Sequence, residues 1–352
     1  MPGTRAMYRA GAIALATVFA FSSGAALAQD KKVRVSMQSA FASSLSVLGP
    51  AAQHYTKTVT RATGGSVDVK FFEPGSLVPP SQHFDAVAAG SLDAAWATPG
   101  YWTGKDIAFA VYSTIPFGPG LGEYIAWMKH AGGEKMMQEL YKKYGIHSMV
   151  CGIISPEASG WFRKEIKSPE DLKGLKMRFF GLGANVMQKL GVSTQLLQAG
   201  EIFQALQLGT IDATEFSMPS MDLSLGFYQV AKHYYFPGWH QQATFSDVMW
   251  SQKKWGELSD LQKDQVDIAC EATLNWELGL SENSQFAALN ELKKKGVTIH
   301  RWSPEMLKTF EKAWIEVANE QREKSPEFKK AFDHLQKFRA DYAIWKDIGY
   351  LQ

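Results

Sequence analysis

The stretch that decides the fold is Leu172–Phe216, LKGLKMRFFGLGANVMQKLGVSTQLLQAGEIFQALQLGTIDATEF. Its apolar runs and helical spacings predict strand, helix, strand, helix and strand in that order. This alternation is typical of a parallel sheet, and such sheets bind ligands outside the carboxyl ends of their strands. Arg178 and Glu215 lie near the ends of two expected strands. They are therefore the first candidates for a binding site.

The same alternation occurs earlier in the chain. The expected strands and helices there are Val33–Gln38, Val47–Arg61, Val67–Phe72, Gln82–Ala89 and Leu92–Ala97. The closing units of both stretches share the spacing of an aromatic residue, a glycine and an aspartate: Phe84, Gly90 and Asp93 in one, Phe203, Gly209 and Asp212 in the other. A repeat that occurs twice predicts two similar α/β lobes. The alternative is that helix–glycine–strand joints are common in any α/β protein.

The rest of the chain completes an α/β prediction with two lobes. Asp260–Lys295 is expected to be one long helix that braces both lobes, and Pro304–Tyr350 a helical C-terminus broken near Pro326. The expected division is a signal peptide over 1–28, mostly lobe I over 29–150, mostly lobe II over 151–240, a return to lobe I over 241–256, the spanning helix over 257–295, and a strand with C-terminal helices over 296–352.

The first residues predict export. Arg5 and Arg9 precede the apolar run Ala10–Phe21, and the small residues before Gln29 indicate cleavage between Ala28 and Gln29. Losing these two arginines lowers the formal charge from +2 to zero. A neutral chain gives no support to nucleic-acid or anionic-membrane binding. We therefore expect a soluble protein of the periplasm.

Two further features bear on chemistry. The two cysteines, Cys151 and Cys270, are compatible with one disulfide in an oxidising compartment or with two buried thiols. No nucleophile elbow, HExxH motif, phosphate loop or dinucleotide glycine pattern occurs in the sequence, so catalysis is not predicted. His233 and His240 lie seven residues apart across a turn, where packing or indirect roles are expected rather than zinc ligation.

Three motifs carry a family resemblance: SPEDLKGLKMR at Ser168–Arg178, GTIDATEF at Gly209–Phe216 and YFPGWH at Tyr235–His240. With them the chain resembles the solute-binding proteins of TRAP transporters over nearly its whole mature length. It is most similar to the branch that binds 2-oxo acids and other small monocarboxylates with a metal ion. The resemblance implies a periplasmic-binding-protein-like fold, hinge closure on the ligand, and delivery to the membrane permease subunits.

The resemblance also implies substrate-binding residues. Arg178 matches the arginine that pairs with the substrate carboxylate, and a guanidinium suits this role because it offers two parallel hydrogen bonds. Tyr101 stands where a phenol reaches the same carboxylate, although Pro99 and Gly100 before it depart from the branch pattern. Glu157, Phe216 and Trp239 complete the expected substrate contacts.

The implied metal ligands are Glu215, the backbone carbonyl of Phe216, Gln241 and Glu157. Glu157 stands where the branch usually has glutamine, and Gln241 where it has glutamate, so an acid and an amide have changed places. Oxygen ligands of this kind suit Na⁺ or Ca²⁺. The alternative is that Glu157 points to solvent and no metal binds.

The expected function is therefore capture of a small organic carboxylate for transport. The alternatives are a binder of C4-dicarboxylates or aromatic acids without metal, a binder linked to a sensor, and, least favoured, a lyase that uses Arg178 and Glu215. The amphipathic C-terminal helix is a candidate for a homodimer contact.

Overall fold

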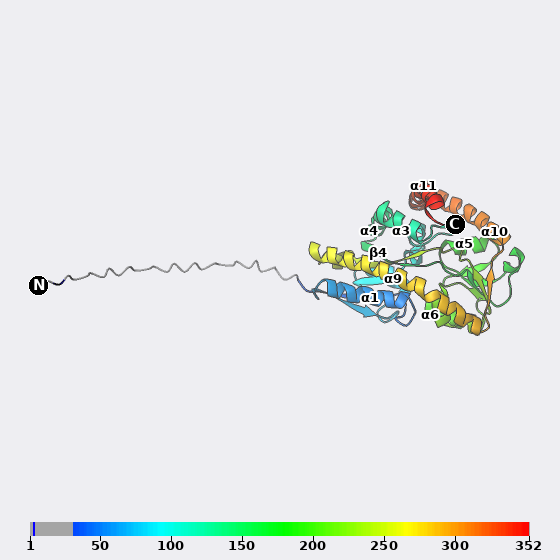
Figure 1. Cartoon of the computed structure of the whole chain (residues 1–352), viewed down its shortest axis with the longest axis horizontal. Coiled ribbons are helices and arrows are strands. Elements are labelled where there is room, and N and C mark those ends of the chain that lie inside the picture. The colour runs from blue at the N-terminus through cyan, green and yellow to red at the C-terminus, as the bar shows by residue number, and fades with distance from the viewer. Residues whose placement is uncertain (1–2, 4–30, 352) are drawn as a thin grey trace. The chain divides into compact units, whose positions relative to one another are not determined.

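The computed structural model describes Gly3 and residues 31–351 (Figure 1). The expected signal peptide and its cleavage site between Ala28 and Gln29 lie outside the described residues. Two sheets form the centre of residues 31–351, with strand orders β2-β1-β3-β10-β4 and β11-β9-β5-β8-β6-β7. The α/β class predicted from the sequence is confirmed. The residue ranges assigned to each lobe stay a prediction.

The first sheet combines an early parallel part with a late antiparallel strand. β1 (Val33–Ser39) pairs in parallel with β2 (Val67–Phe72) and β3 (Ala94–Ala97). β10 (Thr244–Ser251) then runs antiparallel between β3 and β4 (Ile146–Ile154). β10 therefore returns the chain to this sheet after it has built the second one.

The helices around the first sheet pack with one face buried. α1 (Leu48–Ala62) turns Ala51, Tyr55 and Val59 inward at a spacing of four residues, as an amphipathic helix does. The helical segment over 121–142 is divided into two helices by Gly132, whose backbone is left-handed. The other helices here are α2 (His83–Ala88), α3 (Leu121–His130), α4 (Gly133–Lys142), α8 (Gln252–Trp255) and the 3-10 turns Pro80–Gln82, Pro99–Trp102 and Ile107–Tyr112.

The second sheet contains the stretch from which the fold was predicted. β6 (Lys176–Arg178) lies between β7 (Ser193–Gln195) and β8 (Ala213–Thr214), and both pairings are parallel. The intervening helices are α5 (Gly181–Lys189) and α6 (Ala199–Leu208). The predicted alternation is thus confirmed, with strands shorter than expected.

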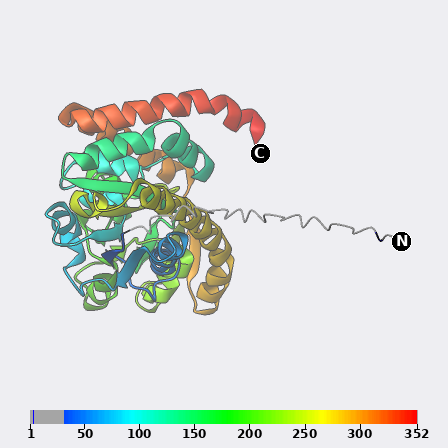
Figure 2. The same cartoon turned by 90° about the vertical axis from the view of Figure 1, so that its left-hand side faces the viewer.

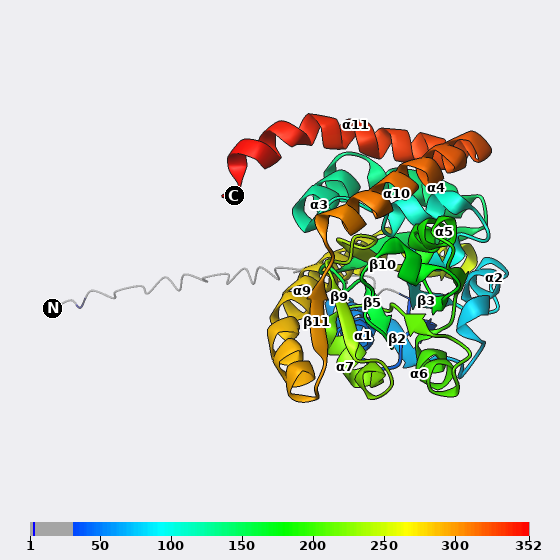
Figure 3. The same ribbon diagram turned by 90° about the vertical axis from the view of Figure 1, so that its right-hand side faces the viewer.

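The remaining strands of this sheet come from three distant parts of the chain. β5 (Gly160–Phe162) pairs antiparallel with β8 and with β9 (His233–Phe236), and β11 (Thr298–Arg301) adds in parallel to β9. α7 (Pro219–Leu225), the turn Phe227–Gln229 and the turn Pro169–Leu172 complete this part. Figure 3 shows β5, β9 and β11 side by side.

A single helix connects the two parts, as predicted. α9 (Asp260–Lys294) is 35 residues long and begins at a Ser259 cap whose side chain accepts a bond from the Gln262 N–H. It packs on α1 and β4 beside the first sheet and on α7 beside the second. Figure 3 shows its C-terminal end near α7. No helix among residues 31–351 is long and apolar enough to cross a membrane.

The C-terminus forms two helices that meet at Ser325. α10 (Pro304–Lys324) packs on α5, and α11 (Pro326–Gly349) lies across α3 and α4 (Figures 2 and 3). The aromatic residues along α11 differ in burial. Phe332 is buried, whereas Trp345 is 53% exposed near the end of α11. Only the first half of α11 therefore has a core to pack against.

Cys151 and Cys270 form a disulfide between β4 and α9, which settles the alternative that the sequence left open. Glu277 is buried on the same helix, where its carboxyl fills the space that the missing side chain of Gly152 leaves in β4. Burial raises the pKa of Glu277 to about 8, with the backbone of Ile153 opposing the shift.

Removing the disulfide should destabilise the protein. It closes a loop across a sequence separation of 119 residues, so its loss frees the unfolded chain. We expect a Cys151→Ser/Cys270→Ser variant to lose about 2–5 kcal/mol of unfolding free energy. Urea unfolding of the variant and of the oxidised parent measures this. Coincident unfolding curves would show that the disulfide adds no stability.

Glu277 should make stability fall with rising pH. A folded-state pKa of about 8 against an ordinary value of 4.5 means that the folded chain holds this proton more tightly. The contribution is complete at acid pH and is lost as pH rises from about 4.5 to about 8, at no more than about 1.4 kcal/mol per pH unit. In Glu277→Gln this component of the slope should disappear in urea unfolding. Glu282→Gln, an exposed position on the same helix, should keep the parent profile.

Candidate functional site

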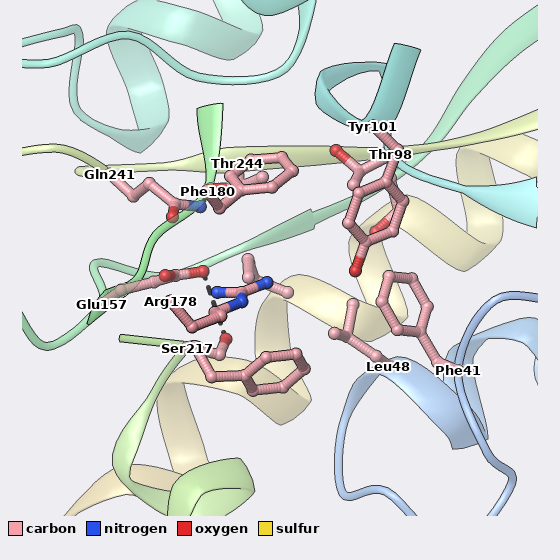
Figure 4. A pocket seen from close by; sticks show the side chains of 13 residues that line it. Phe41, Leu48, Thr98, Tyr101, Glu157, Arg178, Phe180, Ser217, Gln241 and Thr244 are labelled. Carbon is pink, nitrogen blue, oxygen red and sulfur yellow. Dashed lines mark hydrogen bonds between the residues drawn. The ribbon is translucent and has the colours of Figure 1, made fainter. Parts of the chain in front are cut away.

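A small buried pocket lies where strands of both sheets end (Figure 4). Its lining comes from the segments that follow β1, β3, β4, β6 and β8, and from β10 with the turn before it. Five residues predicted from the sequence line it: Tyr101, Glu157, Arg178, Phe216 and Gln241. The sequence reasoning did not identify the other eight lining residues, because each is of a type that is common in loops, strands and helix ends: Phe41, Leu48, Thr98, Ile154, Phe180, Ser217, Thr244 and Ser246.

Arg178 is the buried cation of the pocket. It ends β6, is 1% exposed, and lies 5.3 Å from the ring centre of Phe216. Its Nε donates to the Leu197 carbonyl at 3.2 Å, and its Nη1 donates to the backbone oxygen and Oε1 of Glu215 at 2.8 and 2.7 Å. Nη2 has no acceptor among residues 31–351. One guanidinium nitrogen is thus left for a ligand, while the protein holds the other two.

Glu215 is the ionised partner of this arginine. Its Oε1 also accepts the backbone N–H of Phe180 at 2.5 Å. Burial would raise the pKa of Glu215, but the charge of Arg178, the nearby His240 imidazole and the hydrogen bond from the Phe180 N–H outweigh it and hold the pKa below its ordinary value. The second oxygen, Oε2, has no hydrogen-bond partner in the part of the chain that the structure describes.

Glu157 is shifted in the opposite direction. Burial, followed by the nearby charge of Glu215, raises the pKa of Glu157 well above its usual range. The Ser217 hydroxyl donates to its Oε1 at 3.2 Å, and no residue of 31–351 bonds its Oε2. The side chain is 3% exposed, so it does not point to solvent. Without a cation nearby, the pocket therefore favours one ionised and one protonated acid.

The other predicted residues lie around this pair. Tyr101 faces Arg178 across the pocket (Figure 4), and burial raises the pKa of its phenol to about 12, so it stays a donor. The Gln241 amide donates from Nε2 to Thr244 at 2.8 Å, which leaves its Oε1 without a partner among the described residues. Trp239 is not among the lining residues and instead stacks on Phe310 at 4.7 Å between ring centres.

Two glycines permit the close approach of the loops that carry these residues. Gly238 donates its N–H to the Glu157 carbonyl at 3.0 Å, and a Cβ at this position would overlap that oxygen. Gly100 lies against the ring of Phe180, so the glycine before Tyr101 makes room for an aromatic wall on the opposite side. This departure from the branch pattern therefore has a packing reason.

Glu157, Glu215 and His240 place three ligand atoms within 4.8 Å of one another, all buried. Their free oxygens, with the free Oε1 of Gln241, form a set of donors that lack protein partners within residues 31–351. Buried polar atoms are normally paired, so this set fits a bound cation. The sequence analysis did not identify His240 as a ligand, because it considered this residue only as a partner of His233. In the structure, Nδ1 of His233 instead lies 2.9 Å from Nε2 of His300. The signal that could have identified His240 is its place in the sequence between two predicted site residues, Trp239 and Gln241.

The pocket is also small. The space open to the centre of a water molecule is about 30 Å³. One water needs about 10–15 Å³ on this measure, so the pocket holds about two or three water-sized groups. An arginine nitrogen, a phenol and a cation-binding donor set in so small a space suit a small anion held together with a cation.

The sequence matches one family over most of its length. Residues 38–325 match the family described as DctP, bacterial extracellular solute-binding protein, family 7. The monocarboxylate 2-oxoacid-binding periplasmic protein of Nostoc sp. is 34% identical over 305 residues, which are 85% of this chain and 82% of that protein.

Two solved structures are similar throughout. A TRAP transporter solute-binding protein from Bordetella bronchiseptica, described as a mixed-occupancy dimer with copurified calcium and picolinate, has a TM-score of 0.88 at 34% identity and covers 91% of this chain and 95% of that one. A TRAP periplasmic solute-binding protein from Pseudoalteromonas atlantica with bound sodium and pyruvate has a TM-score of 0.86 at 30% identity, covering 90% and 96%.

Proposed function

The chain belongs to the DctP family of bacterial extracellular solute-binding proteins, and we propose that it captures a small monocarboxylate of the 2-oxo acid class for a TRAP transporter. The observation that carries this proposal is the free Nη2 of Arg178 beside two buried carboxyl oxygens without partners, one on Glu157, which lines the small pocket, and one on Glu215, which contacts Arg178. An anion and a cation are both needed to pair these groups. The proteins with bound pyruvate or picolinate support the ligand class.

The chemistry of the ligand follows from the groups that face it. A 2-oxo acid presents a carboxylate to Arg178 and Tyr101, and a neighbouring carbonyl oxygen to a cation. Its few heavy atoms match the small space at the strand ends. A sugar acid or a long dicarboxylate would need the walls formed by Phe41 and Phe180 to separate.

Glu157, Glu215, Gln241 and the Phe216 carbonyl would hold the cation, with Na⁺ and Ca²⁺ supported by the related structures. The ion would supply positive charge that lets the acids and the substrate carboxylate lie together. With both acids ionised, a divalent ion and Arg178 balance two acids and one substrate carboxylate. With Glu157 protonated, a monovalent ion gives the same balance. The raised pKa of Glu157 therefore links its proton to the charge of the cation.

Capture proceeds by closure of the two lobes. Phe41, Leu48 and Tyr101 reach the pocket from segments around the first sheet, and Arg178 and Phe216 from the second, so only the closed arrangement encloses a ligand. The ligand favours closure because it contacts both sides at once. We assign the protein to the periplasm after signal-peptide cleavage, with the TRAP permease subunits as its partner and no catalytic step.

The C-terminal helix is proposed as a homodimer contact. Ile344, Trp345 and Ile348 are 70%, 53% and 74% exposed on α11, which leaves an apolar surface beyond the part packed on α3 and α4. The Bordetella relative, described as a dimer, supports this proposal.

Arg178 should decide carboxylate affinity. Arg178→Ala removes the buried donor, and we expect pyruvate to bind at least about 100-fold more weakly, equal to about 2.7 kcal/mol. Arg178→Lys keeps the charge but cannot bond Glu215 and ligand together, so it should also bind weakly. Isothermal titration in buffers with Na⁺, with Ca²⁺ and with chelator measures both effects. Arg301→Ala, an exposed arginine on β11, is the control. Unchanged affinity in Arg178→Ala would remove this residue from the ligand site.

The apolar end of α11 should determine the oligomeric state. We expect twice the monomer mass for the mature protein by light scattering, and monomers for Trp345→Glu/Ile348→Glu. Ile268→Glu, which changes a 66% exposed isoleucine on α9, should stay dimeric. A monomeric parent protein would disprove the contact.

A further inference from the structure

We propose that the imidazole of His240 is a direct ligand of the cation, so that the site binds divalent ions that accept nitrogen, of the Mn²⁺, Co²⁺ and Zn²⁺ class, more tightly than Ca²⁺ or Na⁺. The inference rests on the proposed function, because it concerns the cation that accompanies the carboxylate. It adds a nitrogen ligand to a site otherwise built from oxygens. Ca²⁺ and Na⁺ favour oxygen ligands, whereas imidazole suits transition-metal ions.

The spacing of the donor atoms carries the argument. Nε2 of His240 lies 3.5 Å from Oε2 of Glu215 and 4.0 Å from Oε2 of Glu157. Both separations exceed the 2.7–3.2 Å of an N–H···O hydrogen bond. Two ligands that hold one zinc-like ion at about 2.0–2.2 Å in tetrahedral geometry lie roughly 3.4 Å apart. The separation of 3.5 Å between Nε2 and the Glu215 oxygen matches this spacing, and the Glu157 oxygen at 4.0 Å would have to move a few tenths of an ångström closer to share the ion.

The ring is held in this position. His240 is 1% exposed, and its ring packs against Phe179 at 4.8 Å and Trp239 at 5.5 Å between ring centres. Gly183 lies beside its Cβ, where a larger residue would crowd it. Neither Nδ1 nor Nε2 has a hydrogen-bond partner among residues 31–351. A buried polar group without a partner is energetically unfavourable, and an ion at Nε2 would remove part of that cost.

The opposing explanation is a protonated imidazole that pairs electrostatically with the two carboxylates. It requires no metal at Nε2 and leaves an oxygen-only site of Glu157, Glu215, Gln241 and the Phe216 carbonyl. The two explanations differ in one measurable respect, which is whether a bond exists between the ion and Nε2.

A spin coupling detects that bond directly. We would label the mature protein with ¹⁵N-histidine, saturate it with ¹¹³Cd²⁺ and pyruvate, and record the imidazole ¹⁵N signals. One Nε2 signal should split by coupling to ¹¹³Cd, and it should be absent from His240→Phe, in which a ring still fills the space between Phe179 and Trp239. His233→Gln, a histidine on β9 outside the pocket, should keep the split signal.

Ion competition gives a second readout. We expect Co²⁺ and Zn²⁺ to displace Ca²⁺ from the parent protein, and His240→Phe to lose at least tenfold in Zn²⁺ affinity while Ca²⁺ affinity changes less than threefold. His240→Gln, with an oxygen donor, should reverse the preference toward Ca²⁺. An unsplit Nε2 signal in protein that binds Cd²⁺ and pyruvate would overturn the inference and leave the proposed function standing. Pyruvate binding that is indifferent to every ion would overturn both the inference and the cation in the proposed function.

Discussion

The buried ion pair between Arg178 and Glu215 is the interaction on which the site depends. Removing two charges from water is costly, and the cost is recovered only where every remaining donor and acceptor finds a partner. Nη1 and Nε of Arg178 and Oε1 of Glu215 meet this condition with backbone groups that follow β6, β7 and β8. Nη2 and Oε2 do not. The ion pair therefore satisfies the hydrogen bonds that join it to the backbone, and it leaves one nitrogen of Arg178 and one oxygen of Glu215 available to a ligand or an ion.

The second acid, Glu157, links the charge of the site to the cation that it can bind. Glu215 is held ionised by its arginine, whereas Glu157, 3% exposed and beside that negative charge, is pushed toward its protonated form. Two neighbouring buried carboxyl groups thus have opposite pKa shifts, because only Glu215 contacts Arg178. A cation changes this balance, since it permits both acids to ionise. Loss of the proton from Glu157, binding of the cation and binding of the substrate carboxylate therefore affect one another, because their charges lie close together in a buried site.

The scaffold explains why such a site can both form and open. Its residues come from loops at the ends of short strands in two sheets. α9 packs beside both sheets, and the Cys151–Cys270 disulfide fixes α9 to β4 of the first one. Bonds between loops within the second part, such as Gly238 to the Glu157 carbonyl, hold the ligating side chains at fixed spacing. Tyr101 and Phe41 approach from the other part. Rigid loops around a divided pocket are what a binding protein needs if closure is to depend on the ligand.

Local pattern determined most of the architecture. Helix and strand periods act over neighbouring residues, so the alternation around Arg178, the long helix from Asp260 and the break at Pro326 were all predictable. Glycine at 132 was a local signal that the pattern for a single helix obscured. The resemblance to the family likewise pointed to five of the residues that line the pocket.

Only the tertiary structure decided which atoms meet. The disulfide, the burial of Glu157, the contact between Gly100 and Phe180, and the position of His240 among the acids all join residues far apart in the chain. Trp239 shows the converse, because the same turn that brings Gln241 into the pocket points the indole toward Phe310. Residue types and their spacing specify local conformation and the chemistry on offer. Distances, desolvation and the pKa values that follow from them arise only when separate segments pack together.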